Sequence, residues 1–324
     1  MLLIGIISQK RGKMKLEKLN ILDDYLRWLK SYKRDLKYKS IAINTEIVYD
    51  RVLNNFYLFI SESKISSLKE IDREFFLDFM DYTEEDSQKQ IFTKKTKQLY
   101  FSILKSFFLY ISDNNDEFYT YQNEFKISIK GVNKSSKVKY LTDKEILMVL
   151  DYLNKKIENR GSYYDYIYSF GIKLMLFGGL RISEALNLRV DDFIVSDLLD
   201  ENKDRDMYEI HLENTKAQEQ QSAIVKIIDI EKELDYFRDS DYIFLSTKGT
   251  KINRSNFYVA VNNIMKKAGV DKKGLHLYRH TCAMSLYRKS KDILVTKEKL
   301  RHSDIKTTMI YAKAEKNDIA KAMR

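Results

Sequence analysis

Apolar residues recur at helical spacing through the first part of this chain, and that period limits its fold more than any other feature. Two stretches repeat one template, with apolar side chains at i, i+3, i+4, i+7, i+8 and i+11, which gives an α-helix a wide buried stripe. They are Tyr49, Val52, Leu53, Phe56, Tyr57 and Ile60, and Tyr100, Ile103, Leu104, Phe107, Phe108 and Ile111. The 324 residues contain no proline, and because proline interrupts helices, its absence also favours a largely helical chain.

The same period predicts an N-terminal four-helix bundle over residues 14–125. A first helix begins near Met14, and a shorter helical segment at 75–82 lies between the two repeated stripes. The first helix carries an apolar stripe of Leu19, Leu22, Leu26 and Leu29. Residues 1–13 precede the helical pattern, and we expect them to be a disordered extension.

A second domain is expected over residues 141–324. Residues 126–140 contain Gly, Ser and five lysines without a sustained period, which is typical of a linker. Thr142 then opens Thr-Asp-Lys-Glu, a capping box that starts a helix. Further on, strand-like runs at 208–213 and 222–229 predict a hairpin with a long mobile tip at 214–221, and helical spacing returns after Asn253. The predicted fold class is therefore mainly α: a four-helix domain, then a mixed, mostly helical domain with a small antiparallel sheet.

The charge balance favours a polyanionic partner. The chain has 57 Lys and Arg against 47 Asp and Glu, a net charge of +10. Residues 271–324 hold 14 basic and 6 acidic side chains, whereas residues 191–213 hold nine acidic ones, so we expect one face to attract phosphates and another to repel them. An AT-rich coding sequence would also enrich Lys, Ile, Asn and Tyr, so charge alone leaves nucleic-acid binding open.

Several other classes are excluded or made improbable by the sequence. There is no apolar run near the roughly 18 residues that cross a bilayer. Cys282 is the only cysteine and cannot close an intrachain disulfide, so we expect a cytoplasmic protein. Phosphate-binding and dinucleotide-binding glycine motifs are missing. His276 and His280 have a zinc-like i, i+4 spacing, but Leu277 stands where that motif needs Glu, so neither a metal nor another cofactor is predicted.

Two sites carry residues suited to binding a phosphate. His276 and Arg279 are three residues apart and share one face of a helix. Arg181 follows Gly178-Gly179 and opens a predicted helix at 182–188, where the glycines permit close approach by a ligand backbone. Taken singly, an Arg at a helix start is usually a surface residue.

Taken in order, these sites resemble the tyrosine recombinase (phage integrase) family. Residues 178–186, Gly-Gly-Leu-Arg-Ile-Ser-Glu-Ala-Leu, resemble its first arginine box. Residues 276–281, His-Leu-Tyr-Arg-His-Thr, resemble its His-x-x-Arg box, and residues 302–311, His-Ser-Asp-Ile-Lys-Thr-Thr-Met-Ile-Tyr, its histidine and nucleophile box. Two departures stand out. Arg301 replaces the glycine that usually precedes the second histidine, and residues 288–292 lack the usual glycine between helices.

The resemblance implies a role for each of six residues. Arg181 and Arg279 would clamp a DNA phosphate, with His302 as a third donor, while Tyr311 attacks it. His276 would assist Tyr311, which loses its proton in the local positive field. Lys216 is the only lysine of the hairpin tip, and it would protonate the leaving 5′ oxygen.

The resemblance also implies partners. The product would be a 3′-phosphotyrosine with a free 5′ hydroxyl, formed without metal or ATP, and four protomers would exchange strands between two duplexes through a Holliday junction. Inverted-repeat half-sites in double-stranded DNA are the expected substrate. Phosphate-binding roles are expected for the linker and for Lys94, Lys97 and Lys105, which lie within about 80° of one another and away from the apolar face of their helix.

The compact two-domain organisation of the chain favours a Xer-like enzyme that resolves chromosome dimers. A DNA translocase at the division septum would be a further partner. Three alternatives stay open at this point: an integrase of a mobile element, a type IB topoisomerase, and a DNA-binding protein that has lost catalysis.

Overall fold

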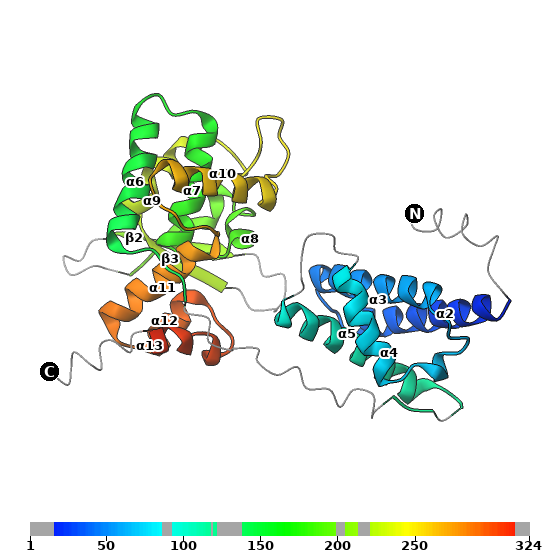
Figure 1. Ribbon diagram of the computed structural model, residues 1–324. Helices are drawn as coiled ribbons and strands as arrows, with labels where there is room; N and C mark the ends of the chain where they lie inside the picture. The colour runs from blue at the N-terminus through cyan, green and yellow to red at the C-terminus, as the bar shows by residue number, and fades with distance from the viewer. Residues whose placement is uncertain are drawn as a thin grey trace. The chain divides into compact units, whose positions relative to one another are not determined.

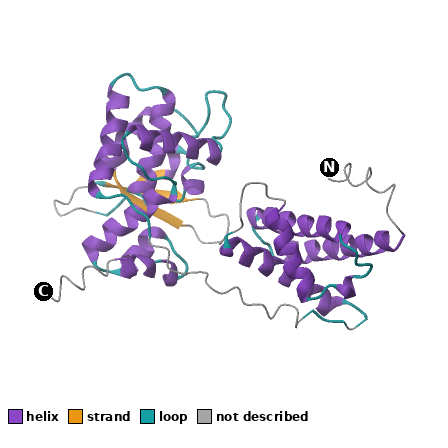
Figure 2. Cartoon of the chain, viewed as in Figure 1, coloured by secondary structure: helices purple, strands orange, loops and turns teal. Residues whose placement is uncertain are grey.

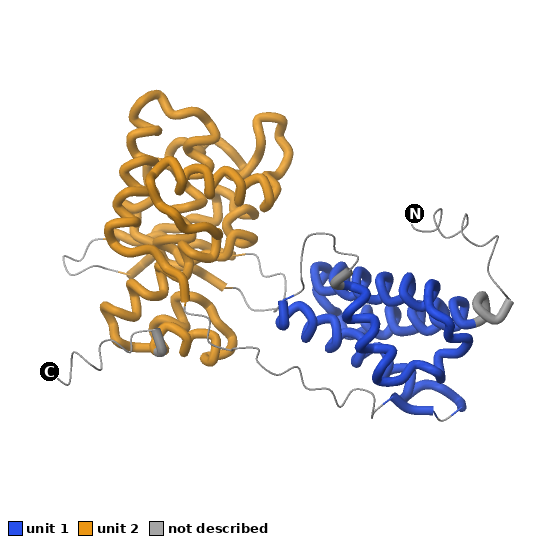
Figure 3. Tube along the Cα trace, in the orientation of Figure 1, with its two compact units in different colours: residues 1–134 blue, residues 135–324 orange. Residues whose placement is uncertain are grey.

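The computed structural model describes six stretches of the chain, residues 16–85, 93–117, 119–121, 138–198, 205–212 and 221–314. They belong to two compact units, residues 1–134 and 135–324, which are coloured separately in Figure 3. The expected extension at 1–13, most of the expected linker at 126–140 and Lys216 lie outside the described residues.

The described residues of the first unit include four α-helices (Figure 1). They are α2 (Leu16–Tyr38), α3 (Ile43–Glu62), α4 (Arg73–Glu85) and α5 (Lys94–Asn114), with the 3-10 turn η2 (Leu68–Glu70) between α3 and α4. Both repeated apolar templates are buried as their spacing predicts, except that Tyr49 is only half-buried. The predicted four-helix bundle is confirmed.

Aromatic rings fill the core of this bundle. Phe56 of α3 is fully buried, and its ring centroid lies 4.8 Å from that of Phe79 and 5.5 Å from that of Phe108. Such edge-to-face pairs stabilise a core by about 0.5–1.5 kcal/mol beyond the burial of area. α3, α4 and α5 therefore meet at one aromatic cluster.

The second unit is mostly helical around one small sheet (Figure 2). Its helices are α6 (Asp143–Glu158), α7 (Tyr163–Leu176), α8 (Ile182–Ala185), α9 (Ile227–Tyr236), α10 (Arg254–Lys267), α11 (His276–Ser290), α12 (Ile293–Leu300) and α13 (Met309–Ala314), with 3-10 turns η3 (Val190–Asp192) and η4 (Ile305–Thr307). The antiparallel sheet has the order β1 (Phe193–Val195), β2 (Met207–Leu212), β3 (Gln221–Lys226). This confirms the predicted fold class.

α7 is the central helix of the second unit. It contacts α6, α8, α9, α10 and α11, and all its residues from Ser169 to Leu176 are buried. The predicted capping box is also present at the start of α6, where Thr142 Oγ1 accepts a hydrogen bond from Glu145 N and Glu145 Oε2 accepts one from Thr142 N. The helices that carry the motif residues are therefore anchored on a buried scaffold.

Two local predictions were wrong in extent. The strand expected at 222–229 ends at Lys226, because a helical period begins there and buries Ile230 and Leu234 of α9. The helix expected at 182–188 ends at Ala185, because the next hydrogen bonds, from Asn187 N to Glu184 O and from Leu188 N to Ala185 O, follow the tighter i, i+3 pattern.

Candidate active site

Arg181 stands at the N-terminus of α8, after a turn that requires glycine. Gly179 has φ +64°, a left-handed conformation, and a Cβ atom there would lie 3.2 Å from Leu300 Cδ2 and 3.3 Å from Cys282 Sγ. Its missing side chain thus lets α11 and the end of α12 approach the turn. The close approach predicted at this glycine pair is made by the protein's own helices.

Glu184 lies between three arginines. Its Oε1 is 2.5 Å from Arg181 Nη1, its Oε2 is 2.8 Å from Arg301 Nη2, and its Oε2 is 3.7 Å from Arg279 Nη1. It also accepts a hydrogen bond from Arg181 N at 2.7 Å. Burial acts to raise the pKa of Glu184, but Arg301 and Arg181 outweigh it and hold the pKa below its usual value. The ionised carboxylate of Glu184 therefore pairs with arginines from three separate segments of the chain.

Arg279 of α11 is buried and fastened to the backbone. Its Nη1 donates to Gly179 O at 2.5 Å, and its Nη2 donates to Leu300 O. Burial, followed by the charge of Arg181, lowers the pKa of Arg279 to about 10, so it remains a cation at neutral pH. Each terminal nitrogen has two N–H groups, which leaves donors that can address a phosphate.

Two of the predicted histidines face the same arginines. His302 Nδ1 lies 2.9 Å from the hydroxyl of Thr308, and burial, followed by the charges of Arg279 and Arg181, lowers the pKa of His302 to about 4. Burial and then the charge of Arg254 lower the pKa of His276 as well. The pKa of about 4 makes His302 a neutral imidazole at neutral pH.

Tyr311 of α13 is 1% exposed and packs with Ala283, Met284 and Leu300. Its hydroxyl oxygen lies 2.8 Å from His280 Nδ1. Burial raises the pKa of Tyr311 to about 12, although the charge of Arg279 acts to lower it. The positive field expected from the sequence is present, but desolvation exceeds its effect in this structure.

Five of the predicted site residues thus lie within one region of the second unit, although they come from segments far apart in the sequence. They are Arg181, His276, Arg279, His302 and Tyr311. Lys216 lies outside the described residues, and the three predicted phosphate-binding lysines lie on α5 of the first unit.

Sequence reasoning missed two residues of this region, His280 and Glu184. Signals for both were present, because His280 follows His276 by four residues and Glu184 follows Arg181 by three, spacings that share a helical face.

One lysine of α5 is placed differently from the prediction. Lys94 and Lys105 are exposed, but Lys97 is half-buried. At 100° per residue, Lys97 lies on the same stripe as the buried Leu104 and Phe108, so the expectation that it lies away from the apolar face was wrong.

The two missing glycines are replaced by residues in the left-handed conformation. Lys291 ends α11 with φ +53°, and Arg301 ends α12 with φ +53°. Left-handed geometry is strained for residues with a Cβ. The backbone at both departures thus keeps the shape that glycine favours, and the side chain of Arg301 becomes available to Glu184.

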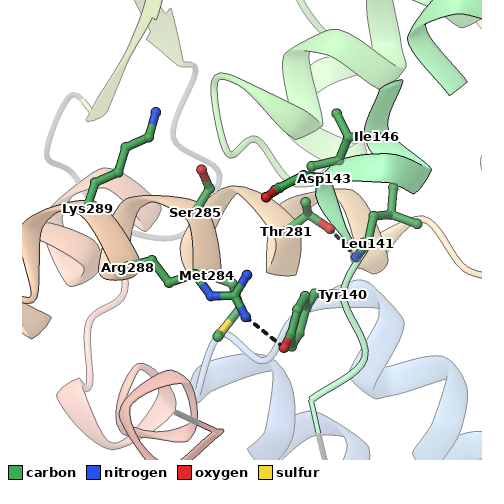
Figure 4. Close-up of a pocket in the computed structure, with 9 residues that line it drawn as sticks. All are labelled: Tyr140, Leu141, Asp143, Ile146, Thr281, Met284, Ser285, Arg288 and Lys289. Atoms are coloured by element: carbon green, nitrogen blue, oxygen red, sulfur yellow. Dashed lines mark hydrogen bonds between the residues drawn. The ribbon is translucent and has the colours of Figure 1, made fainter. Parts of the chain in front are cut away.

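The segment before α6 is fastened to the helix that carries the candidate residues. Arg288 Nη2 donates to the Tyr140 hydroxyl at 2.9 Å, and Leu141 N donates to Thr281 Oγ1 at 2.8 Å, at the edge of a pocket shown in Figure 4. Val138 and Tyr140 also pack against the cluster that contains Tyr311. The end of the expected linker therefore contacts both α11 and the surroundings of the candidate nucleophile.

No helix within the described stretches is long and apolar enough to cross a membrane.

Comparisons with known proteins identify a family, relatives and solved structures that this chain resembles. The phage integrase family matches residues 139–318. The tyrosine recombinase XerH of Helicobacter pylori is 29% identical over 308 residues, which cover 87% of this chain and 79% of that protein. XerH of Campylobacter jejuni is 26% identical over 289 residues, 83% of this chain and 74% of that protein. Among solved structures, XerH bound to a palindromic difH substrate after cleavage has a TM-score of 0.69 and 25% identity, and the match covers 85% of this chain and 78% of that one.

Proposed function

The chain belongs to the phage integrase family, and we propose that Arg181, His276, Arg279, His302 and Tyr311 form its active site. It is a Xer-like tyrosine recombinase, an enzyme that breaks and rejoins DNA at specific sites. The observation that carries the residue assignment is the gathering of Arg181 and Arg279 around Glu184, close enough to Tyr311 for the charge of Arg279 to act on its phenol.

The two arginines bind the scissile phosphate. As the tyrosine oxygen attacks, negative charge builds on the phosphate oxygens, and fixed guanidinium donors stabilise that charge more than they stabilise the starting diester. Glu184 and the carbonyl oxygens of Gly179 and Leu300 hold both guanidinium groups before DNA arrives. His302 adds a donor through Nε2 in the tautomer whose Nδ1 accepts the hydrogen bond of the Thr308 hydroxyl.

Cleavage exchanges one ester for another. The Tyr311 oxygen gives its proton to a neighbouring histidine and forms a bond to phosphorus. The bond from phosphorus to the 5′ oxygen breaks, and that oxygen leaves as a hydroxyl after taking a proton from Lys216. Attack by a 5′ hydroxyl reverses the step and rejoins the strand. The phosphotyrosine conserves the bond energy, so neither ATP nor a metal ion enters the balance.

The proposed DNA complex uses both parts of the chain. Residues 14–125 are the core-binding domain, 126–140 the linker and 141–324 the catalytic domain, and the exposed Lys94 and Lys105 contact phosphates. Four protomers hold two inverted-repeat sites and exchange strands through a Holliday junction in the cytoplasm. The proposed role is chromosome dimer resolution with a septal DNA translocase, rather than integration of a mobile element.

A suicide substrate tests this function. Duplexes that bind the protein are first selected from a random library and then nicked beside the scissile phosphate, so that the released 5′ fragment diffuses away. We expect a covalent protein–DNA adduct with the wild type and joining of two copies of the selected site when intact duplexes are supplied. Adduct without joining would identify a topoisomerase, and binding without adduct would identify a protein that has lost catalysis.

A further inference from the structure

The hydroxyl of Tyr311 has a histidine as its partner, and that histidine is outside the set proposed above. Tyr311 Oη and His280 Nδ1 are 2.8 Å apart, and the two ring centroids are 5.8 Å apart. His280 lies on α11, one residue after Arg279, so the same buried helix positions the phosphate-binding arginine and the partner of the phenol.

The direction of this hydrogen bond follows the tautomer of His280. Burial, followed by the charges of His276 and Arg279, lowers the pKa of His280 to about 4, so its ring is neutral at pH 7 and has one acceptor nitrogen. The pKa of Tyr311, raised to about 12 by burial, keeps its proton on the phenol. Within the described part of the chain the phenol has no other hydrogen-bond acceptor. Tyr311 Oη donates to Nδ1 in the tautomer that carries the ring proton on Nε2, and proton transfer from Tyr311 to His280 requires this tautomer.

Neither of the other two histidines is placed for this contact. His302 uses Nδ1 for the Thr308 hydroxyl. His276 lies one turn before His280, with 6.4 Å between the ring centroids, and no hydrogen bond joins it to Tyr311 among the described residues. His280 is thus the histidine that touches the reacting atom.

We propose that His280 is a catalytic residue, the general base that takes the proton of Tyr311 during cleavage and returns it during rejoining. This inference rests on the proposed function. In the forward step the O–H bond of Tyr311 breaks, its proton moves to His280 Nδ1, and the phenolic oxygen bonds to phosphorus as the 5′ oxygen leaves. The phosphate held by Arg181 and Arg279 adds negative charge that offsets the arginine charge acting on His280, which favours the imidazolium.

Chemical rescue separates a base from a packing residue. We expect His280→Ala to form the covalent adduct on the suicide substrate about a hundredfold more slowly than wild type, the usual contribution of a general base. Added imidazole should restore part of the rate by occupying the space left beside Tyr311, and imidazoles of higher pKa should restore more. His276→Ala with the same imidazoles is the matched control, and its rate should not rise with their pKa.

His280→Asn is the second arm, because its amide oxygen lies near the position of Nδ1 and accepts a hydrogen bond but no proton. We expect this variant to be as slow as His280→Ala while binding DNA normally. Cleavage within a few-fold of wild type by either variant, or no response of His280→Ala to any imidazole, overturns the inference. If wild type forms adduct and Tyr311→Phe does not, these failures leave the proposed recombinase function standing.

Discussion

Two buried tyrosines, one in each unit, have almost the same burial but different partners. Tyr25 of α2 is 0% exposed and donates its hydroxyl proton to Leu53 O at 2.8 Å. Tyr311 of α13 is 1% exposed, with its hydroxyl 2.8 Å from His280 Nδ1. Burial raises the pKa of both phenols. A carbonyl oxygen is a far weaker base than an imidazole nitrogen, so the partner, and not the depth of burial, distinguishes a structural phenol from a candidate nucleophile.

The surroundings of the two tyrosines differ in the same way. In the first unit, Tyr25 packs against aromatic rings, with its centroid 5.3 Å from that of Phe107. In the second unit, the described residues include three buried charged side chains, Lys173, Glu233 and Arg279. Burying charge costs free energy unless it is paired. Lys173 is paired with Glu233, and Arg279 contacts Glu184 and Gly179 O, so the second unit keeps buried charges where the first has aromatic rings.

The strongest test of this comparison exchanges each tyrosine for phenylalanine. We predict that Tyr311→Phe forms no covalent adduct and still binds DNA, because only the nucleophilic oxygen is lost. Tyr25→Phe should cleave normally and lower the free energy of unfolding by about 1 kcal/mol, the usual contribution of one hydrogen bond. Adduct on a denaturing gel and thermal unfolding measure the two effects. Wild-type adduct from Tyr311→Phe would end its assignment as nucleophile.

The arginines should give the next largest effect. We predict that Arg181→Ala and Arg279→Ala each slow single-turnover cleavage by at least about a hundredfold. They should differ in stability, since Arg279 also bonds the carbonyl oxygens of Gly179 and Leu300, so only Arg279→Ala should unfold at a clearly lower temperature. Arg27→Ala on the exposed face of α2 is the control for loss of a surface arginine. A rate within a few-fold of wild type would remove that arginine from the site.

Lys216 should give a defect that depends on the leaving group. We predict that Lys216→Ala cleaves ordinary DNA slowly and recovers on DNA with a bridging 5′ sulfur, because a thiolate leaves without a proton. The measurement is the single-turnover cleavage rate of Lys216→Ala and of wild type on each of the two substrates. Equal defects on both would mean that Lys216 only binds phosphate.

Substitutions at Lys291 and Arg301, where a residue other than glycine has a left-handed backbone conformation, should have the smallest effects on stability and cleavage. Lys291→Gly removes backbone strain at an exposed position, and we predict that it raises the free energy of unfolding by up to about 1 kcal/mol. Arg301→Gly removes the same strain but also the 2.8 Å contact with Glu184, so it should lower that free energy. It should also slow cleavage several-fold, because Glu184, the partner of Arg181, is then held less firmly. Equal gains of stability in both variants would show that the Arg301–Glu184 pair contributes nothing.

Much of the fold was predictable because its signals are local. The stripes of α3 and α5 and the Thr142 capping box depend on residues within a few turns of one another. β1 was missed because three residues are too short for an alternating pattern. Where strand β3 gives way to α9, apolar residues continue through Ile227, so the change of period is hidden.

Parts of the candidate site were also readable in the sequence, because the spacing of Arg181, Arg279, His302 and Tyr311 follows one family pattern. The contacts among these residues could not be predicted from the sequence. Arg301 and Glu184 are 117 positions apart in the chain, and His280 and Tyr311 are 31 apart, so no local period connects them.

The sequence by itself determined which chemical groups this protein brings to a phosphate and which helices carry them, since residue type and helical period are properties of short segments. Only the tertiary structure decided which groups pair. The left-handed turn at Gly179 brings α8, α11 and the end of α12 together, and burial in this region lowers the pKa of His280 and His302 and raises that of Tyr311. For that reason Tyr311 is paired with His280, a contact that depends on how α13 packs against α11 and that no spacing in the sequence specifies.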